Sequence, residues 1–454
     1  MRRLLLTTAA ALGASMGFVG SAYAQSPTVP PPPNAGYGVG GLGAPPPTAT
    51  VAPASGVIAP NSFVVHLNGR INWYAGVEGD SSNGLAGFKN DPYQFQGYIR
   101  LYPGFDAVAA NGLQYGVVSE TRMPGSTFEG AGDSPGATSG TDTVYWRRAY
   151  GYVGTAEVGT FRFGMGDGPM DIFQTGTFEG FNDGAWNGDV PFFVPGSTEP
   201  SYPFADVGAY YTVNRVVYLS PSFSGFQFGI GFAPNTSNLW NAQCSVAGPT
   251  CNNLSASPDA ANQKRWRNMI DAGGTYTGTF GPVGLALGGG FVASNSVNYD
   301  GGVAPLGSEY NGFSFGQFGG TVTFAGFTVG GNIGYGKMNG DYSLQPKGGQ
   351  NELAFMVGGQ YAAGPFVVGA SYFKTKYAGG WTYANALAGV ARTETDQGVA
   401  AGGTYDIAPG MALYLSYLYG LRHQVGYDFY TGDPGTVGNN THSQVFSIGT
   451  VLKW

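Results

Sequence analysis

The last nine residues, FSIGTVLKW (446–454), decide the fold because they alternate strictly. Phe446, Ile448, Leu452 and Trp454 fall on one side of an extended strand. Small or polar residues and Lys453 fall mainly on the other. A period of two is that of a β-strand, here with one face suited to lipid and the other to a polar interior.

The same alternation recurs back to about residue 63. Clear examples are Phe63, Val65, Leu67, Ile71 and Trp73; Tyr93, Phe95, Ile99 and Leu101; Leu353, Phe355, Val357 and Tyr361; and Met411, Leu413, Leu415, Tyr417 and Tyr419. Between Gly312 and Phe324 the apolar parity switches, which predicts a β-bulge there. A chain of amphipathic strands that ends on an aromatic residue is typical of bacterial outer-membrane barrels.

The connections between these strands alternate between two sizes. Short ones are expected near Val108–Asn111, Thr155–Gly159, Pro221–Gly225, Phe280–Pro282, Ala325, Gly364 and Ala408–Pro409, and long ones near 77–91, 124–143, 166–208, 235–267, 294–311, 339–350, 378–394 and 423–442. Short periplasmic turns and long outer loops are the rule in such barrels. The pattern predicts an all-β, transmembrane antiparallel β-barrel of about 16 strands, a size that leaves an aqueous channel.

Composition separates this fold from a secreted β-sandwich or propeller, which would have similar turns. Glycine accounts for 79 of 454 residues, aromatic residues for 15% and charged residues for only 10%. Soluble domains carry roughly a quarter charged residues. Scarce charge with abundant Tyr and Phe suits a surface that faces lipid.

The N-terminal segments have other predicted roles. Residues 1–24 fit a signal peptide, with Arg2 and Arg3, an apolar stretch and Ala22-Tyr23-Ala24 as the cleavage pattern. Residues 25–60 carry no charge and many Pro and Gly residues, which predicts a disordered periplasmic leader. The barrel is expected over residues 61–454, in the outer membrane after export through the periplasm.

Charge and cysteine content exclude several classes of function. The signal holds two of the 20 Lys and Arg residues and none of the 27 acidic residues, so the mature chain carries a net charge of about −9. This argues against nucleic acid as a partner. Cys244 and Cys251 predict one local disulfide. No cofactor or metal site is indicated.

The longest loop, residues 166–208, is acidic and aromatic. No Lys or Arg lies between Arg162 and Arg215, whereas the loop holds Asp167, Asp171, Glu179, Asp183, Asp189, Glu199 and Asp206 together with Phe173, Phe178, Phe181, Trp186, Phe192 and Phe193. Because so aromatic a loop favours burial, we expect it to fold into the lumen and pack on the wall.

Arginines of the preceding strands share the inward parity. They are Arg70, Arg100, Arg122, Arg147 and Arg162. An acidic loop opposite an arginine wall would set a transverse field across a narrow, wet constriction. Asp167, Asp171, Glu179 and Asp183 are the candidate loop acids. For each single arginine, solvation of the lumen or pairing with Glu120 is an equally good interpretation.

Two stretches resemble the general trimeric porins of Gram-negative bacteria. They are YWRRAYGYVGTAEVGTFRFG (145–164) and NRVVYLSPSFSGFQFG (214–229). The resemblance implies an inward-folded third loop, Arg147 as a constriction arginine, a homotrimer, and Trp454 as a signal read by the barrel-assembly machinery. Met165 stands where the family often has a basic residue at the strand end. Leu219 follows Tyr218 where some members have a wall arginine, although Arg215 lies on the same face.

The expected function is passive diffusion of ions and small hydrophilic solutes through an outer-membrane channel with weak cation selectivity. A substrate-selective channel for sugars or anions is the alternative. An enzyme is not expected, because the only histidines, His66, His423 and His442, form no nucleophile–base pattern. Outer-membrane lipid is the expected surrounding partner.

Overall fold

The computed structural model describes residues 58–125, 143–204, 213–237, 264–298, 309–340, 342–380 and 393–454. The predicted signal peptide, nearly all of the predicted leader, and both cysteines of the predicted disulfide lie outside these ranges. The first strand begins at Ser62, close to the start expected for the barrel.

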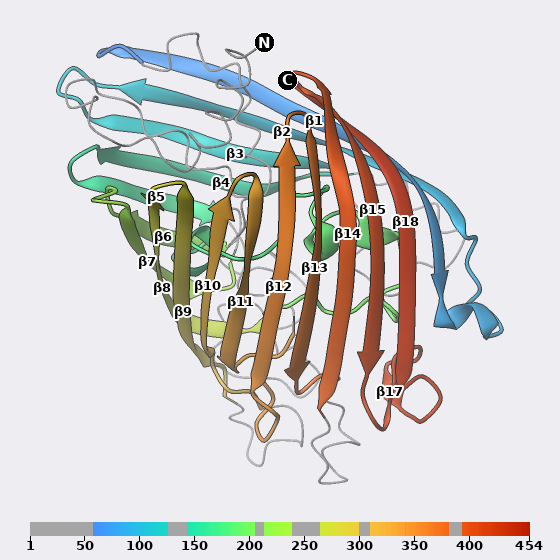
Figure 1. Cartoon of the computed structure of the whole chain (residues 1–454). Coiled ribbons are helices and arrows are strands. Elements are labelled where there is room, and N and C mark those ends of the chain that lie inside the picture. Colours follow the sequence, from blue (N-terminus) through green and yellow to red (C-terminus); the bar gives the residue numbers. More distant parts are fainter. Residues whose placement is uncertain are drawn as a thin grey trace.

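The described chain forms one closed barrel of 16 antiparallel strands (Figure 1), which confirms the predicted fold class and strand number. The barrel strands are β1 (Ser62–Asp80), β2 (Tyr93–Val108), β3 (Gln114–Gly125), β4 (Thr143–Thr155), β5 (Gly159–Gly166), β6 (Val213–Leu219), β7 (Phe226–Asn235), β8 (Trp266–Phe280), β9 (Val283–Ser296), β10 (Ser314–Phe324), β11 (Phe327–Lys337), β12 (Glu352–Ala363), β13 (Phe366–Tyr377), β14 (Glu394–Ala408), β15 (Met411–His423) and β18 (Asn440–Lys453). Closure satisfies the backbone groups of every strand, as a membrane requires.

The C-terminal strand closes the barrel. It pairs with β15 on one side and with β1 on the other, where Ile71 lies opposite Leu452. The backbone N–H of Trp454 donates to the carbonyl of Gly69 at 3.0 Å, and the N–H of Gly69 donates back at 3.1 Å. The terminal residue therefore completes the seam.

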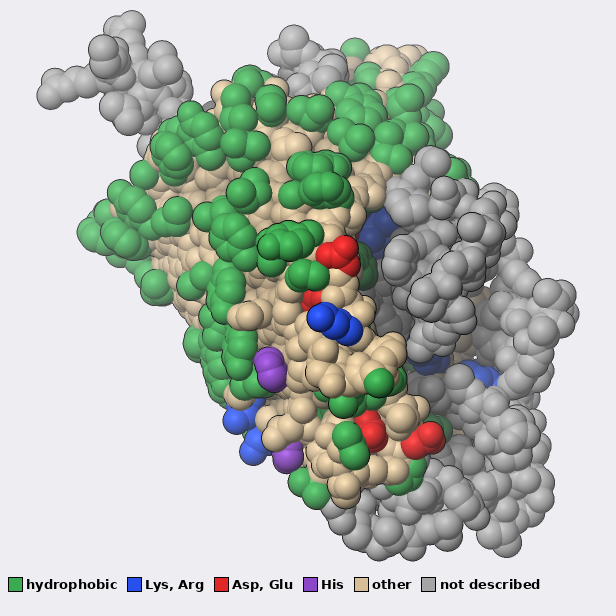
Figure 2. Space-filling view, turned by 90° about the vertical axis from the view of Figure 1, so that its right-hand side faces the viewer, with side chains coloured by type: hydrophobic (Ala, Val, Ile, Leu, Met, Phe, Trp, Pro, Cys, Tyr) green, Lys and Arg blue, Asp and Glu red, His purple; other side chains and the backbone are tan. Residues whose placement is uncertain are grey.

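The outer surface carries the apolar half of each alternating strand (Figure 2). Phe63, Val65 and Leu67 are exposed, as are Phe324 and Phe327 on the far side of the barrel. Neighbouring rings pack across strands: Trp73 and Phe95 lie 5.4 Å apart, centroid to centroid. This is the surface that a bilayer would cover.

The two rims differ as the sequence predicts. The turns between β10 and β11 and between β12 and β13 are short, and Gly326 and Gly364 adopt positive φ there. The long connections gather at the rim opposite the C-terminus (Figure 1). They include a 3-10 helix, η1 (Ser81–Gly84), and a small hairpin of β16 (Tyr427–Asp428) and β17 (Asp433–Pro434). No helix in the described ranges is long and apolar enough to cross a bilayer.

The bulge predicted between Gly312 and Phe324 is wrong. β10 pairs with β9 and β11 without a shift of register. Phe313 and Phe315 are buried on the inner side, whereas Phe318 is exposed on the outer side. The ring of Phe315 fits inside because Gly334, on β11, has no side chain in its place. Large apolar residues on both faces of one strand produced the apparent change of parity.

Candidate pore-lining site

The longest connection begins after β5 and lies against the inner wall over residues 167–204. It contains α2 (Pro169–Ile172) and two 3-10 helices, η3 (Ala185–Asn187) and η4 (Val190–Phe193). Its contacts move around the barrel as the chain proceeds. Asn332 of β11 donates to the carbonyl of Thr175 at 2.7 Å, and Trp186 Nε1 donates to Val399 O of β14 at 3.1 Å.

Later residues of this segment reach the strands at the seam. Arg422 of β15 donates to the carbonyl of Gly196 at 2.8 Å, and Ser443 of β18 donates to that of Thr198 at 3.0 Å. A loop that crossed the lumen would meet the wall only at its two ends. This one follows the wall strand by strand, and we refer to residues 167–204 as the lining segment.

Glycines on the inner face make room for the lining segment. A Cβ at Gly358 would lie 2.7 Å from Cγ of Phe178, and a Cβ at Gly369 would lie 2.8 Å from Cβ of Phe181. The lining segment comes equally close to other glycines of the wall, which include Gly76, Gly273, Gly288, Gly290, Gly319, Gly398 and Gly420. This use of glycine was not predicted, although glycines at inward positions of successive strands are visible in the sequence.

The aromatic residues of the lining segment are buried with one exception. Phe173, Phe178, Phe181, Trp186 and Phe193 lie at 4% exposure or less, and Phe192 is 63% exposed. Most of them join a cluster that includes Tyr74, Met356, Phe373 and Leu418 from the wall. Burial of these rings fixes the segment to the wall through the hydrophobic effect.

Two of the candidate wall arginines contact acids of the lining segment directly. Arg100 donates to both carboxylate oxygens of Asp189, at 3.0 and 3.1 Å, and its guanidinium lies 4.3 Å from the centroid of Tyr98. Arg70 Nη1 lies 3.7 Å from Asp183 Oδ1. At these two pairs the loop acids contact the wall arginines directly, whereas the sequence suggested that they face each other across a narrow, wet constriction.

Further polar groups hold Asp183. Asn72 donates to Asp183 Oδ2 at 2.8 Å, and Tyr74 contacts the same oxygen through its hydroxyl. Asp183 belongs to the lining segment and not to a membrane-spanning strand. Burial raises the pKa of this carboxyl to about 6, against the opposing effect of Arg70. The charge of Asp183 therefore changes close to neutral pH.

The remaining candidate arginines of β3 and β4 converge on a single carboxylate. Glu120 accepts from Arg122 Nε at 2.7 Å, from Arg147 Nη1 at 3.0 Å and from Arg148 Nη1 at 2.5 Å. Arg148 Nε also donates to Asp167 at 2.7 Å. Arg122 is the most exposed of these arginines, with 21% of its side chain accessible.

Arg148 was missed because parity places it on the outer face. Glu120 pairs with Arg148, but the next residue, Thr121, pairs with Trp146. Arg147 is therefore the extra residue of a β-bulge, and the bulge lets two consecutive arginines enter the interior. A second arginine directly after an inward one is the only sequence signal of this feature.

The other candidate residues occupy separate positions. The guanidinium of Arg162 lies 5.4 Å from the ring centroid of Tyr150. Glu179 is buried and accepts from Tyr202 at 2.7 Å and from Asn187 at 3.1 Å, both within the lining segment. Asp171 is also buried.

Two ion-pair groups were not among the predicted site residues. Arg215 of β6 donates to Asp271 of β8 at 2.6 Å. Arg422 donates to Glu394 at 2.9 Å, and Asp396 beside it accepts from the backbone N–H of Ser201 in the lining segment at 2.7 Å. Glu394 and Asp396 are inward residues of β14, so strand parity carried a signal for them.

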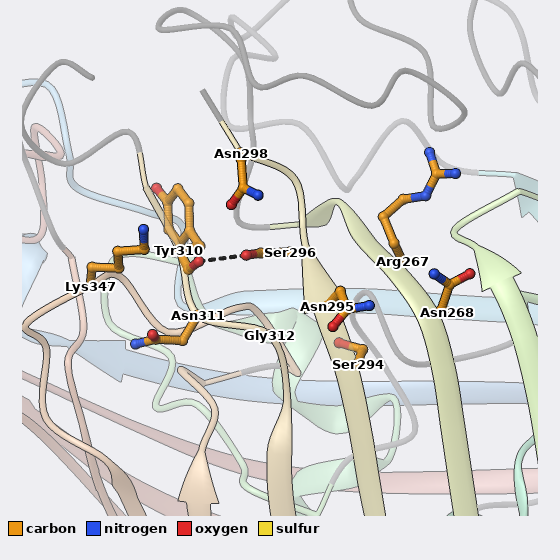
Figure 3. Close-up of a pocket in the computed structure, with 10 residues that line it drawn as sticks. All are labelled: Arg267, Asn268, Ser294, Asn295, Ser296, Asn298, Tyr310, Asn311, Gly312 and Lys347. Atoms are coloured by element: carbon orange, nitrogen blue, oxygen red, sulfur yellow. Dashed lines mark hydrogen bonds between the residues drawn. The ribbon is translucent and has the colours of Figure 1, made fainter. Parts of the chain in front are cut away.

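A cavity of about 450 Å³ opens at the long-loop rim (Figure 3). The described residues that line it include Arg267, Tyr310 and Lys347, and none of them is acidic. Lys347 Nζ lies 3.1 Å from Glu309 Oε1. The remaining residues are Asn268, Ser294, Asn295, Ser296, Asn298, Asn311 and Gly312. Ser296 donates to the carbonyl of Tyr310 at 2.6 Å. The rim therefore holds a polar cavity with basic and amide groups.

The fold resembles that of a solved porin structure. The chain is similar to an anion-selective porin from Comamonas acidovorans, with 14% identity over 87% of this chain and all of the other, and a TM-score of 0.51. It is also similar to OmpT, an outer membrane protein of Vibrio cholerae, with 15% identity, the same coverage and a TM-score of 0.49. No curated protein matches the chain.

A family model described as Gram-negative porin matches residues 8–423, which is most of the chain. The match agrees with the closed barrel of 16 strands, the alternating connections and the loop that lies along the inner wall. The chain therefore belongs to the Gram-negative porin family and is a channel protein of the bacterial outer membrane.

Proposed function

We propose that this porin is a passive diffusion channel for ions and small hydrophilic solutes, with a weak preference for cations. The observation that carries the proposal is the path of the lining segment, which follows the wall from β11 to β18. A segment that lies against the wall narrows the lumen without blocking it. Its buried rings and the wall glycines hold it there.

The distribution of charge supports weak selectivity. Arg70 and Arg100 are matched by Asp183 and Asp189, so their fields largely cancel. Arg422 lies beside two carboxylates, and the chain as a whole carries more acids than bases. A small excess of negative charge favours cations, and salt screens it. The anion selectivity named for the Comamonas acidovorans porin belongs to a protein with only 14% identity.

The pair Arg100–Asp189 offers a direct test of selectivity. The reversal potential across a salt gradient is measured in planar bilayers for the wild type, Asp189→Asn, Arg100→Gln and the double variant. We expect Asp189→Asn to move selectivity toward anions, Arg100→Gln to move it toward cations, and the double variant to return close to the wild type. Lys89→Gln, in an exposed rim loop, is the control for a charge change away from the lining segment.

Two results would contradict the proposal. Purified protein that adds no steps of ionic conductance would exclude the channel in this form. Single variants that move the reversal potential in the same direction, or leave it unchanged, would show that the pair does not lie at the conducting path. In that case Arg70, Arg100 and Asp183, which were expected at the constriction, and Asp189, which pairs with Arg100, would have no part in selectivity.

The rim cavity favours a second candidate, a channel that prefers anionic or polyhydroxylated solutes. Asparagine amides, serine hydroxyls and a tyrosine suit a sugar, and Arg267 with Lys347 suits an anionic group. Arg267→Gln/Lys347→Gln should then reduce the uptake of a sugar phosphate into proteoliposomes but not that of the uncharged sugar. If the variant takes up the sugar phosphate and the uncharged sugar as fast as the wild type does, passive diffusion remains the proposed function.

We also propose a homotrimer in which each barrel conducts, with assembly dependent on Trp454. Closed symmetry is the usual state of homo-oligomers, and the exposed apolar rows of β1 and β2 offer a surface for it. Chemical cross-linking in outer-membrane vesicles should give a ladder that ends at three chains. A ladder that ends at one chain would exclude the trimer.

A further inference from the structure

Three lysines lie on the outer surface of the barrel near its long-loop rim. They are Lys337 of β11 and Lys374 and Lys376 of β13. Lys376 lies opposite Leu353, and Lys374 lies opposite Phe355. Residues that lie directly opposite share a face of the sheet. Leu353 and Phe355 are 43% and 36% exposed on the lipid side, so these lysines also point outward.

Two histidines extend this row across the neighbouring strands. Thr395 of β14 lies opposite both Lys376 and His423, which places His423 on the same face. Leu421 of β15 lies opposite both Gln397 and His442. Lys337, Lys374, Lys376, His423 and His442 together form what we call the basic belt. Lys, Arg and His side chains gather at the lower edge of the hydrophobic band in Figure 2.

No acidic side chain of these strands shares the outer face with the belt. Glu352 of β12, Glu394 and Asp396 are all buried on the inner side, and Glu394 is paired with Arg422 there. Within the described part of the chain, none of the three lysines forms an ion pair. The outer face here therefore presents positive charge that no ion pair within the described residues neutralises.

Tyrosines fix the depth of the belt in the membrane. Tyr335 precedes Lys337 by two residues, and Tyr372 precedes Lys374 by two, so each tyrosine lies on the same face and closer to the apolar band. Aromatic girdles mark the boundary between hydrocarbon and headgroups. One step of two residues along a strand is roughly 7 Å. The lysines therefore lie at the level of the headgroups.

We propose that the basic belt binds the phosphate groups of anionic lipids in the outer leaflet of the outer membrane. Long loops face the outside of the cell in such barrels, so this rim lies in the outer leaflet. Lysines near an anionic lipid surface attract its headgroups. The exposed side chains of Phe355 and Val357 continue below the belt and suit acyl chains. A dissolved anion would gain nothing from that apolar surface.

The test measures lipid binding by native mass spectrometry of the purified protein in detergent. The probes are diphosphoryl lipid A and the same glycolipid after removal of its phosphates. The test variant is Lys337→Gln/Lys374→Gln/Lys376→Gln. The matched control is Lys89→Gln/Lys264→Gln, which removes two charges from exposed residues of the same rim and is compared with Lys374→Gln/Lys376→Gln as well as with the triple variant. Heat-shifted electrophoretic mobility shows that each variant is folded.

We expect the test variant to bind diphosphoryl lipid A roughly 100-fold more weakly, on the order of fivefold for each lysine. The control variant should stay within about twofold of the wild type, and Lys→Arg at the three belt positions should retain binding because the charge remains. The dephosphorylated lipid should bind weakly to every variant.

Three results would overturn the proposal. The test variant could bind as tightly as the control, in which case the lysines do not recognise the lipid. The wild type could bind the dephosphorylated lipid equally well, in which case the apolar band alone is responsible. Inorganic phosphate at the concentration of the lipid could displace it fully, which would make the belt a site for free phosphate.

Discussion

Arg100 of β2 forms an ion pair with Asp189, the residue that precedes η4. Nη2 of Arg100 lies 3.0 and 3.1 Å from the two carboxylate oxygens of Asp189. The two residues are 89 positions apart, and both are buried. The pair joins the lining segment to β2, the second strand from the seam between β1 and β18. Because both charges are shielded from water, the loss of one partner is costly, whereas the loss of both is much less so.

This pair should control how firmly the lining segment is attached. We predict that Asp189→Ala leaves Arg100 buried without its anion, at a cost of about 3–5 kcal/mol. The segment should then become accessible to a protease added to folded protein, as followed by mass spectrometry of the fragments. Arg100→Met/Asp189→Leu removes both charges and should restore much of the resistance. Equal cleavage of single and double variants would show that the ion pair does not attach the segment.

The glycines beneath the lining segment give a second prediction with a built-in control. Gly358 faces Phe178, whereas its neighbour Gly359 lies against Thr328 and Val329 of the next strand. We predict that Gly358→Leu displaces Phe178 and costs about 1–3 kcal/mol through overpacking. Single-channel records should show larger current noise because the segment moves. Gly359→Leu should give quiet records, and noisy records from both variants would contradict the prediction.

Most of the fold could be predicted because it depends on local patterns. A period of two shows which face of each strand meets lipid, and glycine-rich short turns alternate with long polar loops. These signals require no knowledge of which strands pair. The exception arose at Phe313 and Phe315, which are buried on the inner side, and the ring of Phe315 fills space left by Gly334 on a neighbouring strand.

The site was less predictable because it depends on contacts between distant residues. Parity placed Arg70, Arg100 and Arg147 inside, but it could not show that Asp189 would meet Arg100 or that Arg148 would turn inward at a bulge. The path of the lining segment follows from packing of its rings against glycines of many strands. No single window of sequence contains that information.

The protonation of Asp183 gives a prediction for pH dependence. Because burial raises the pKa of Asp183 to about 6, the carboxylate is charged above that pH and neutral below it. We predict that cation preference falls as the pH falls through 6, since negative charge beside Arg70 is lost. Reversal potentials measured between pH 5 and 7, roughly one pH unit on either side of this pKa, would detect the change in cation preference.

Asp183→Asn should remove this change of cation preference with pH. Glu157→Gln, a substitution in an exposed turn, should keep it. Between the ordinary pKa of 3.8 and about 6 the folded protein binds a proton that the unfolded chain does not. This group therefore makes the barrel more stable as the pH falls through that window. A step of unchanged size in Asp183→Asn would assign it to another group.

The seam between Trp454 and Gly69 gives the last prediction. The two backbones exchange hydrogen bonds at 3.0 and 3.1 Å, and the indole lies over Gly69, where a side chain would displace it. We predict that Trp454→Asp lowers the amount of folded barrel in the outer membrane, because a charge on the lipid-facing row is costly. Trp454→Phe should assemble close to normally, since it keeps an aromatic ring at the interface. Gly69→Leu should also weaken assembly, as Trp454→Asp does, because it displaces the ring without adding charge.

Quantitative blots of outer-membrane fractions, with heat-shifted mobility as the measure of folding, would compare the three variants. Normal levels of folded Trp454→Asp protein would show that closure of the barrel depends on the backbone pairing of β18 alone.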